Sequence, residues 1–408
     1  MSPWAGSDSF GADKLKNKPL KIAHVTPYYL PAWRYGGPIR SVHGLCCALA
    51  ASGHEVHVFT TNVDGPGELD VPIGVPVDVD GVKVWYFPVG SLRRLYWSSQ
   101  LTQAFRQRVA EFDIVHIHAV FLLPTLQAAR AALKAGVPYV VSPRGVLVPE
   151  LFRRKSFWIK TLWMKLFDNF TIEQAADIHV TSRRESNEMA HFGLRLRKVC
   201  LIPNGIELPA AQDGELSPAV AAAIRHERMV LFMGRVSWEK GLDRLIRALH
   251  HLPDTFLAIA GNEDFAFGRQ MRELAASLAV SERLSFVGQV HGADKVALFS
   301  HARLLVLPSY SENFGNVVLE AMAVGCPVVV SDEVGAADVV REVEAGLVSS
   351  GVPEQLAANI RTILENASLR EKMSEAGMHA VREQYSWGIV ASNMLSTYLE
   401  ILAEGRLR

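Results

Sequence analysis

Short apolar runs alternate with amphipathic segments along the first half of the chain. The runs are rich in β-branched residues, which favours strands that are buried on both faces. The pattern predicts strands at residues 21–26, 54–61, 82–88, 113–119, 137–143, 176–182 and 198–205, and helices at 40–53 and about 122–135. Buried strands that alternate with helices predict a parallel sheet with helices on both faces.

The same pattern begins again in the second half of the chain. It predicts strands at 229–235, 255–261, 284–289, 302–309 and 326–332, and helices near 241–251, 268–279, 293–300 and 316–324. The predicted fold class is therefore α/β, with two doubly wound Rossmann-like domains. Ligands of such sheets bind beyond the carboxyl ends of the strands, so we expect a cleft between two facing domains.

Length also supports two domains, because 408 residues exceed one typical core. The boundary is predicted in the polar, Pro-bearing segment near 205–228. The expected parts are a flexible tail at 1–19, an N-terminal Rossmann-like domain at 20–205, a C-terminal Rossmann-like domain at 206–387 and a last helix at 388–408 that could pack back on the N-terminal domain.

Composition excludes some classes of protein. Lys plus Arg and Asp plus Glu are balanced at 42 each, which gives no support to a nucleic-acid partner. The N-terminus has no apolar stretch of the kind found in secretory signals, and no run approaches the roughly 18 apolar residues of a spanning helix. The four cysteines form no CxxC pair, and we expect reduced, buried thiols. They are Cys46, Cys47, Cys200 and Cys326. We expect a cytoplasmic protein that is soluble or peripheral to a membrane.

Two glutamates, Glu312 and Glu320, follow one predicted strand with seven residues between them. Glu312 falls in a loop and Glu320 about one turn into the next helix, where its carboxylate could accept two hydrogen bonds from a ribose. Gly315 permits close backbone approach, and the free N–H groups of the helix start form an anion site. The alternative is that Glu320 is only a favourable charge near a helix N-terminus and Glu312 a solvated loop acid.

Two cations, Arg235 and Lys240, flank a turn after the first strand of the second domain, and Gly241 opens the next helix. Such a pair can neutralise a diphosphate. Without further evidence, Arg235 and Lys240 would be interpreted as two solvated surface cations. The binding interpretation gains weight because both cations and both acids follow carboxyl ends of strands in one domain.

The first turn of the N-terminal domain contains Gly36, Gly37 and a proline, where a backbone could contact a phosphate. It lacks the GxGxxG of dinucleotide-binding proteins, and a simple tight turn is an equal alternative. His116 and His118 alternate along a strand and point the same way. Their spacing could suit a metal, but no Cys or carboxylate set accompanies them, so His118 is a candidate for the cleft and His116 for the core.

In this order and spacing, these features resemble glycosyltransferase family 4, which has the two-domain GT-B fold. The resemblance covers residues 20 to 400, approximately. Its most specific motif is E-x7-E, here Glu312 to Glu320 in ENFGNVVLE. Supporting motifs are GRVSWEKG, IPNGIE, the YGGP turn and the HIH strand.

The resemblance implies that a nucleotide-sugar donor lies mainly on the C-terminal domain and the acceptor on the N-terminal one. It implies donor contacts for Gly36, Gly37, Gly234, Arg235, Lys240, Val290, Glu312, Asn313, Phe314, Gly315, Asn316 and Glu320. Of these, Glu312 would contact the sugar, Glu320 the ribose, and Arg235 and Lys240 the diphosphate. With them, His118 would line the reaction centre.

The reaction implied is transfer of a hexose, from a donor of the UDP-glucose or GDP-mannose type, with retention of anomeric configuration. Its acceptor would be a glycan or a lipid-linked molecule in surface polysaccharide assembly. Cations and helix dipoles would stabilise the leaving diphosphate, so neither a metal nor a cofactor is expected. The principal alternative is an inactive relative that serves as a nucleotide-sugar-binding or scaffold protein. An inverting enzyme lacks a convincing catalytic carboxylate, and a periplasmic-type receptor would need an export signal.

Residues 152–170 combine five cations with many large apolar side chains. We expect one helical face to be core: Phe152, Ile159, Leu162, Trp163, Leu166 and Phe170. Outside this face, Phe157 and Met164 fall near Arg153 and Lys160, and apolar groups on a basic face fit a membrane surface or a lipid-linked acceptor. An ordinary amphipathic helix is the alternative. Arg144, at the end of a strand, is a candidate for an acceptor phosphate or hydroxyl.

Overall fold

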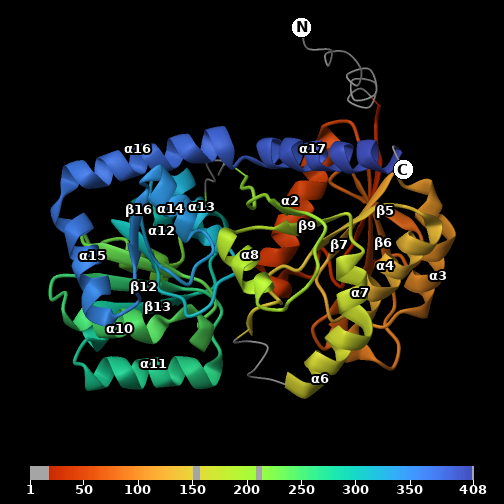
Figure 1. Cartoon of the computed structure of the whole chain (residues 1–408). Coiled ribbons are helices and arrows are strands. Elements are labelled where there is room, and N and C mark those ends of the chain that lie inside the picture. The colour runs from red at the N-terminus through yellow and green to blue at the C-terminus, as the bar shows by residue number, and fades with distance from the viewer. Residues whose placement is uncertain (1–17, 150–156, 208–213, 407–408) are drawn as a thin grey trace, which may run out of the picture. The chain divides into compact units, whose positions relative to one another are not determined.

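The computed structural model describes residues 18–149, 157–207 and 214–406. It divides into an N-terminal unit, Met1–Gly205 with Trp387–Arg408, and a C-terminal unit, Ile206–Ser386 (Figure 1). Most of the tail expected at 1–19, part of the expected boundary segment, and Phe152 and Arg153 lie outside the described residues.

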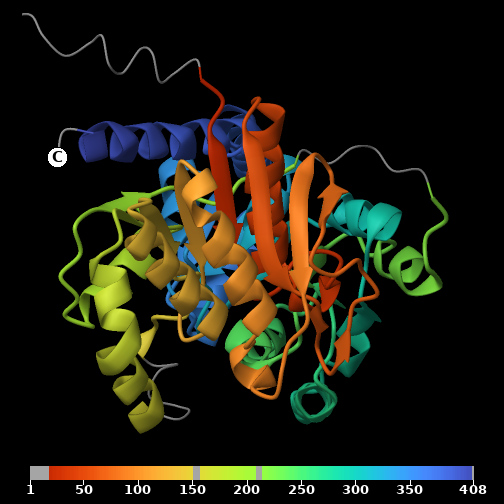
Figure 2. The ribbon, with the colours of Figure 1, turned by 90° about the vertical axis from the view of Figure 1, so that its right-hand side faces the viewer.

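The N-terminal unit contains one eight-stranded sheet in the order β10-β9-β8-β7-β1-β2-β6-β5. Its strands are β1 (Lys21–Val25), β2 (Glu55–Thr61), β5 (Pro76–Val79), β6 (Val82–Phe87), β7 (Ile114–His118), β8 (Tyr139–Ser142), β9 (Asp177–Val180) and β10 (Val199–Leu201). Neighbours are parallel except β5 and β6, which form an antiparallel edge hairpin. Figure 2 shows β1, β2 and β6 side by side in red and orange.

Helices connect these strands in the alternating pattern that the sequence predicts. They are α2 (Gly37–Ala51), α3 (Ser99–Arg108), α4 (Leu123–Ala135), α6 (Phe157–Trp163), α7 (Asn169–Glu173) and α8 (Arg183–Ala190), with a π-helical stretch at Met164–Asp168. A two-stranded ribbon, β3 (Val63–Asp64) and β4 (Gly67–Glu68), follows β2. The last helix, α17 (Trp387–Arg406), belongs to this unit and packs on α2.

The C-terminal unit contains six parallel strands in the order β13-β12-β11-β14-β15-β16. They are β11 (Met229–Met233), β12 (Phe256–Ala260), β13 (Leu284–Gly288), β14 (Leu304–Leu307), β15 (Val328–Ser331) and β16 (Gly346–Ser349). The helices are α9 (Pro218–Ala223), α10 (Leu242–His250), α11 (Phe265–Ser277), α12 (Gly292–His301), α13 (Asn316–Ala323), α14 (Ala337–Val343), α15 (Pro353–Glu365) and α16 (Ala367–Gln384).

Helix α10 shows how sequence spacing produces the layers. Leu242, Leu245, Ile246 and Leu249 stand at positions i, i+3, i+4 and i+7 of one helical face, and all four are buried. They face the sheet strands β11 and β12, whose apolar side chains belong to the same cluster. Burial of each such side chain contributes about 1.5–3 kcal/mol, so this single face outweighs the weak helical propensity of nine residues.

The prediction for the face of residues 152–170 is wrong. Ile159, Leu162, Leu166 and Phe170 are 58–70% exposed, whereas Met164, expected outside the face, is buried. The opposite side of the helix packs inward, because the buried carboxylate of Asp168 accepts hydrogen bonds from the Phe121 amide (2.8 Å) and the Trp163 indole (3.0 Å). The π-helical stretch at Met164–Asp168 lies at this anchor.

Candidate active site

In the C-terminal unit, β11 and β14 are neighbours although other strands separate them in sequence. The order of strands along the chain reverses between them, and open α/β sheets bind ligands at such a point. Gly234 and Arg235 follow the end of β11, and the loop with Glu312 follows β14. The sheet therefore brings the predicted cations and the first predicted acid to the same edge.

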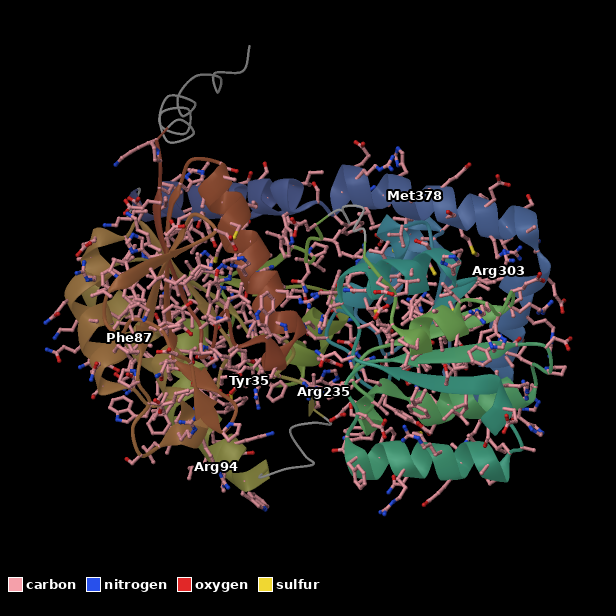
Figure 3. The ribbon with its side chains drawn as sticks, turned by 180° about the vertical axis from the view of Figure 1, so that it is seen from behind. Tyr35, Phe87, Arg94, Arg235, Arg303 and Met378 are labelled. Carbon is pink, nitrogen blue, oxygen red and sulfur yellow. The ribbon has the colours of Figure 1, made fainter. Side chains whose placement is uncertain are left out.

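Lys240 and Glu312 form an ion pair across this edge, with most of both side chains covered. Arg235 is exposed and, among the residues that the structure describes, takes part in no salt bridge (Figure 3). The pair compensates two charges that would be costly to desolvate separately. It leaves Arg235 available to an anion from solution.

The loop after β14 is fixed from two sides by backbone hydrogen bonds. The amide of Tyr310 donates to the carbonyl of Glu239 at 2.8 Å, on the Lys240 side. The amide of Gly335 donates to the carbonyl of Glu312 at 3.0 Å, and the amide of Ala336 to that of Phe314 at 2.8 Å. The loop is thus held at the geometry in which Glu312 meets Lys240.

Two glycines are required where these segments approach each other. At Gly241, with φ of 66°, a Cβ would overlap the carbonyl oxygen of Pro308. At Gly315, φ is 90°, and the residue ends the loop at the N-terminus of α13. Asn313 and Asn316 are half-buried beside it, and the Phe314 ring is buried in the core.

The second predicted acid, Glu320, pairs with Lys295 of α12 at 2.8 Å, and each side chain is about one-fifth exposed. The ion pair fixes one carboxylate oxygen near the surface. Val290 precedes α12 and packs half-buried against the core of the unit. Lys295 was not predicted as a site residue, because in the sequence it is only one lysine in the first turn of a predicted helix.

A second cation that the sequence analysis missed is Arg244. Its guanidinium lies over the Tyr310 ring at 3.8 Å and donates to the carbonyls of Pro308 (3.1 Å) and Ser309 (3.2 Å). It also bonds the carboxylate of Glu333 at 3.0 Å. Because its bonds go to the loop itself, Arg244 supports the loop.

In the N-terminal unit, the corresponding reversal lies between β1 and β7. His24 of β1 and His118 of β7 share a hydrogen bond of 2.9 Å there, and both rings are buried. His116 bonds the Tyr398 hydroxyl of α17 at 2.6 Å and the Ser142 hydroxyl at 2.8 Å. His116 is therefore a satisfied core histidine.

Arg144 sets the tautomer of His118 in this cluster. It is half-buried with φ of 57° and donates to Nδ1 of His118 (3.3 Å) and to the Asn204 side chain (3.0 Å). A guanidinium cannot accept, so Nδ1 of His118 accepts and its Nε2–H donates to His24. Burial, and then the Arg144 charge, lower the pKa of His24 to about 3 and that of His118 well below its ordinary value. Both imidazoles are neutral near pH 7.

The histidine cluster does not suit a cation. Ring nitrogens of His24, His116 and His118 lie close enough together to hold a metal ion. Both nitrogens of His116 are already bonded, however, and the Arg144 guanidinium would repel a cation at His118.

Gly36 and Gly37 lie between the turn Trp33–Tyr35 and α2. Gly36 has φ of 70°, and no heavy atom lies within 4 Å of a Cβ placed on it, so backbone conformation alone requires glycine. Tyr35 (labelled in Figure 3) anchors the turn. Its ring stacks on Tyr28 with 4.1 Å between centroids, and its hydroxyl accepts a hydrogen bond from the Gly65 amide at 2.9 Å.

Comparison with known proteins identifies the family. Residues 36–205 match the "Glycosyl transferase 4-like domain" and residues 217–380 match "Glycosyl transferases group 1". A phosphatidyl-myo-inositol mannosyltransferase of Mycobacterium leprae is 36% identical, over 95% of this chain and 98% of that protein. The chain is a glycosyltransferase of the family 4 type.

Solved structures agree on the fold of this glycosyltransferase. A sucrose-phosphate synthase from Thermosynechococcus elongatus has a TM-score of 0.73 at 23% identity, over 94% of this chain and 100% of that one. An Anabaena protein in complex with UDP-glucose has a TM-score of 0.68 at 20% identity, covering 93% and 99%. The predicted GT-B fold and family resemblance are confirmed.

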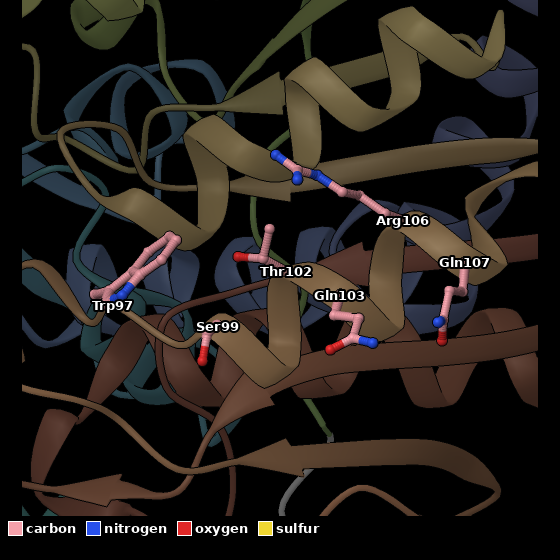
Figure 4. Close-up of a pocket in the computed structure, with 6 residues that line it drawn as sticks. All are labelled: Trp97, Ser99, Thr102, Gln103, Arg106 and Gln107. Atoms are coloured by element: carbon pink, nitrogen blue, oxygen red, sulfur yellow. The ribbon is translucent and has the colours of Figure 1, made fainter.

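The glycosyltransferase also has a shallow pocket of about 360 Å³ over α3 (Figure 4). It is lined by Trp97, Ser99, Thr102, Gln103, Arg106 and Gln107. None of these is a residue that the sequence singled out, and the Arg106 guanidinium donates a hydrogen bond to the Gln127 side chain of α4 at 2.7 Å.

Among the described helices, none is both long enough and apolar enough to cross a membrane.

Proposed function

We propose that this glycosyltransferase transfers a hexose, with retention, from a donor of the UDP-glucose or GDP-mannose type to a glycan or lipid-linked acceptor in surface polysaccharide assembly. The observation that carries the proposal is the Lys240–Glu312 ion pair at the β11/β14 edge, beside Arg235 and the N-terminus of α13. The UDP-glucose complex of the Anabaena protein and the mannosyltransferase name of the Mycobacterium leprae relative support this class of donor.

The ion pair suggests how the donor would be received. A diphosphate carries more charge than a single carboxylate, so it would compete with Glu312 for the ammonium of Lys240. Arg235 and the amides at the start of α13 would complete the anion site. Glu312, released from Lys240, would then accept hydrogen bonds from hydroxyls of the hexose.

The ribose would lie at Glu320, one turn into α13, where Lys295 already orients one carboxylate oxygen. The backbone near Val290 would contact the base. Backbone groups do not by themselves select uracil or guanine, so both donors fit this proposal.

Charge stabilisation is the chemistry that these residues can supply. As the hexose leaves, charge grows on the diphosphate, where Arg235, Lys240 and the α13 amides would stabilise it without a metal. The departing phosphate oxygen would accept the proton of the attacking hydroxyl on the same face of the sugar, which retains the configuration. His118 has both nitrogens bonded inside its unit, so it would reach the hexose only by exchanging one of these bonds.

Turnover tests the assignment of the two acids. Glu312→Ala is expected to lower kcat by at least about tenfold, because a charge-assisted hydrogen bond to the hexose is worth about 1.5–3 kcal/mol. Transfer would be measured with UDP- and GDP-hexoses in EDTA, and the anomeric configuration of the product by NMR. Wild-type kcat in this variant would contradict the role of Glu312. Absence of transfer with every donor and acceptor would favour the inactive alternative.

A membrane surface would supply the lipid-linked acceptor. Trp158, Ile159, Leu162, Leu166 and Phe170 form an apolar stripe, each 58–81% exposed, on a segment that protrudes beyond the strands of its unit (Figure 2). Lys165 is exposed beside the stripe, and Arg153, Arg154 and Lys155 precede the stripe in the sequence. Exposed apolar groups next to cations suit an anionic lipid surface, and Arg144 remains a candidate for the acceptor phosphate.

Vesicle binding tests the stripe. The double variant Leu162→Glu/Leu166→Glu is expected to abolish co-sedimentation with anionic vesicles, because it places two charges in the apolar face. Phe265→Glu is the matched control, since Phe265 is 82% exposed but lies in the other unit. Equal sedimentation of the double variant and the control would refute membrane contact at the stripe.

A further inference from the structure

Three side chains of different chemistry, two half-buried and one exposed, meet at the surface of the N-terminal unit. His43 and Cys47 are one turn apart on the same face of α2. Asp80 lies in the turn between β5 and β6, with φ of 53°. One ligand atom from each residue can be chosen so that all three lie within 4.8 Å of one another.

Two of the separations are close to those around a tetrahedral zinc ion. Nε2 of His43 lies 3.0 Å from the carboxylate of Asp80 and 3.4 Å from Sγ of Cys47. In a tetrahedral site, the bond lengths of zinc to N, O and S place such ligand pairs roughly 3.3 and 3.5 Å apart. The sulfur is also 3.6 Å from Nδ1, beside the ring, so the imidazole must turn to aim Nε2 at an ion.

The other ring nitrogen of His43 already has a hydrogen-bond partner of the kind that orients metal-bound histidines. Nδ1 of His43 lies 2.8 Å from the hydroxyl of Tyr29, which is buried. When Nε2 binds a metal, Nδ1 must carry the proton and donate it, and this outer bond selects that tautomer.

We propose that His43, Cys47 and Asp80 bind a zinc ion, with water as the fourth ligand. Binding displaces the thiol proton of Cys47 to solvent, so affinity rises with pH. The ion would tie the edge hairpin β5–β6 to α2, the helix that begins at Gly37. The role is structural, and it does not depend on the proposed transfer reaction. Spacing between cysteines could not reveal this site, because its signal is His-x3-Cys on one helix.

The test uses the full-length protein, stripped with a chelator and kept reduced. Zinc is titrated by calorimetry, and cobalt(II) replaces it for absorption spectra. One ion per chain, a thiolate-to-cobalt charge-transfer band and a rise in Tm with zinc are expected. Cys47→Ser should abolish the band, and Tyr29→Phe should weaken zinc binding by about 10- to 100-fold. Asp80→Asn keeps a hydrogen-bonding group beside His43 and should also weaken binding.

Cys200→Ser is the matched control, because Cys200 is a half-buried cysteine of the same unit outside the cluster. It should bind zinc as the wild type does. The proposal is overturned if the wild type takes up no zinc, or if Cys47→Ser and Asp80→Asn bind it as tightly as the control. The latter result would place the ion at another site.

Discussion

The histidines of β1 and β7 are buried beside a guanidinium, and this placement affects stability. Burial first, and Arg144 second, lower the pKa of His24 to about 3 in the folded protein, against an ordinary value near 6.5. Between these values the unfolded chain binds more protons than the folded one. The stability that the neutral His24 provides is therefore complete above pH 6.5 and is lost as pH falls below it.

We expect the free energy of unfolding of the N-terminal unit to fall by about 1.4 kcal/mol per pH unit for His24 alone, from pH 6 to 5. The variant His24→Asn should make this slope shallower by about that amount. Denaturant unfolding at several pH values measures it. His301→Asn, an exposed histidine of the C-terminal unit, is the control. A slope unchanged in His24→Asn would contradict the burial argument.

Sequence reasoning located acids and cations better than it located their partners. Glu312, Lys240 and Arg235 could be singled out because each follows a strand in an alternating pattern, and the sheet order places them at one edge. Lys295 and Arg244 were missed, because a cation inside an amphipathic helix resembles any solvated one. Only the three-dimensional structure shows that they bond Glu320 and the β14 loop.

At the level of elements, the turn after β11 presses against the end of β14. Gly241→Ala should destabilise the C-terminal unit by at least about 1–3 kcal/mol, because a Cβ meets the Pro308 carbonyl and φ is 66°. Gly288→Ala shares a positive φ, 80°, but has open space around its Cβ, so it isolates the backbone cost. Thermal unfolding of the two variants compares them. Equal losses would mean that the approach of the two loops does not require glycine.

The buried strands were predictable because they are nearly continuous apolar runs. The edge strands β5 and β16 were not predictable. β5 begins with a proline and contains an aspartate, and β16 begins with a glycine and is mostly half-buried. The apolar face at 159–170 was predicted to be buried, but it is exposed. Periodicity shows that a face is apolar, but it does not show that the opposite face, which carries the buried Asp168, packs against the unit.

At the scale of the whole molecule, the last helix, α17, belongs to the N-terminal unit and packs on α2. The Trp387 ring lies against Gly44 of α2 and against Gly205, where a Cβ on either glycine would overlap the indole. Helix propensity alone would make Gly44→Ala stabilising by about 1 kcal/mol. We expect instead a net loss, because α2 or α17 must shift.

The double variant Gly44→Ala/Trp387→Ala separates these terms. It should show a smaller effect of the Gly44 substitution than the wild-type background does, as a double-mutant cycle of unfolding free energies would measure. A stabilising Gly44→Ala in the wild type would contradict the packing of α17 on α2. The sequence allowed this return of the last helix but could not establish it, because the packing depends on two small residues distant in sequence.

The β11/β14 edge is the proposed binding site for a nucleotide-diphosphate hexose. Calorimetric titration of UDP-, GDP- and ADP-hexoses into the wild type and Glu320→Ala, with EDTA present, tests it most directly. We predict that one nucleotide class binds the wild type without metal, and that Glu320→Ala weakens this binding by about 10- to 100-fold through loss of charged hydrogen bonds. Equal affinity of the two proteins, or no binding of any nucleotide class to the wild type, would contradict the account.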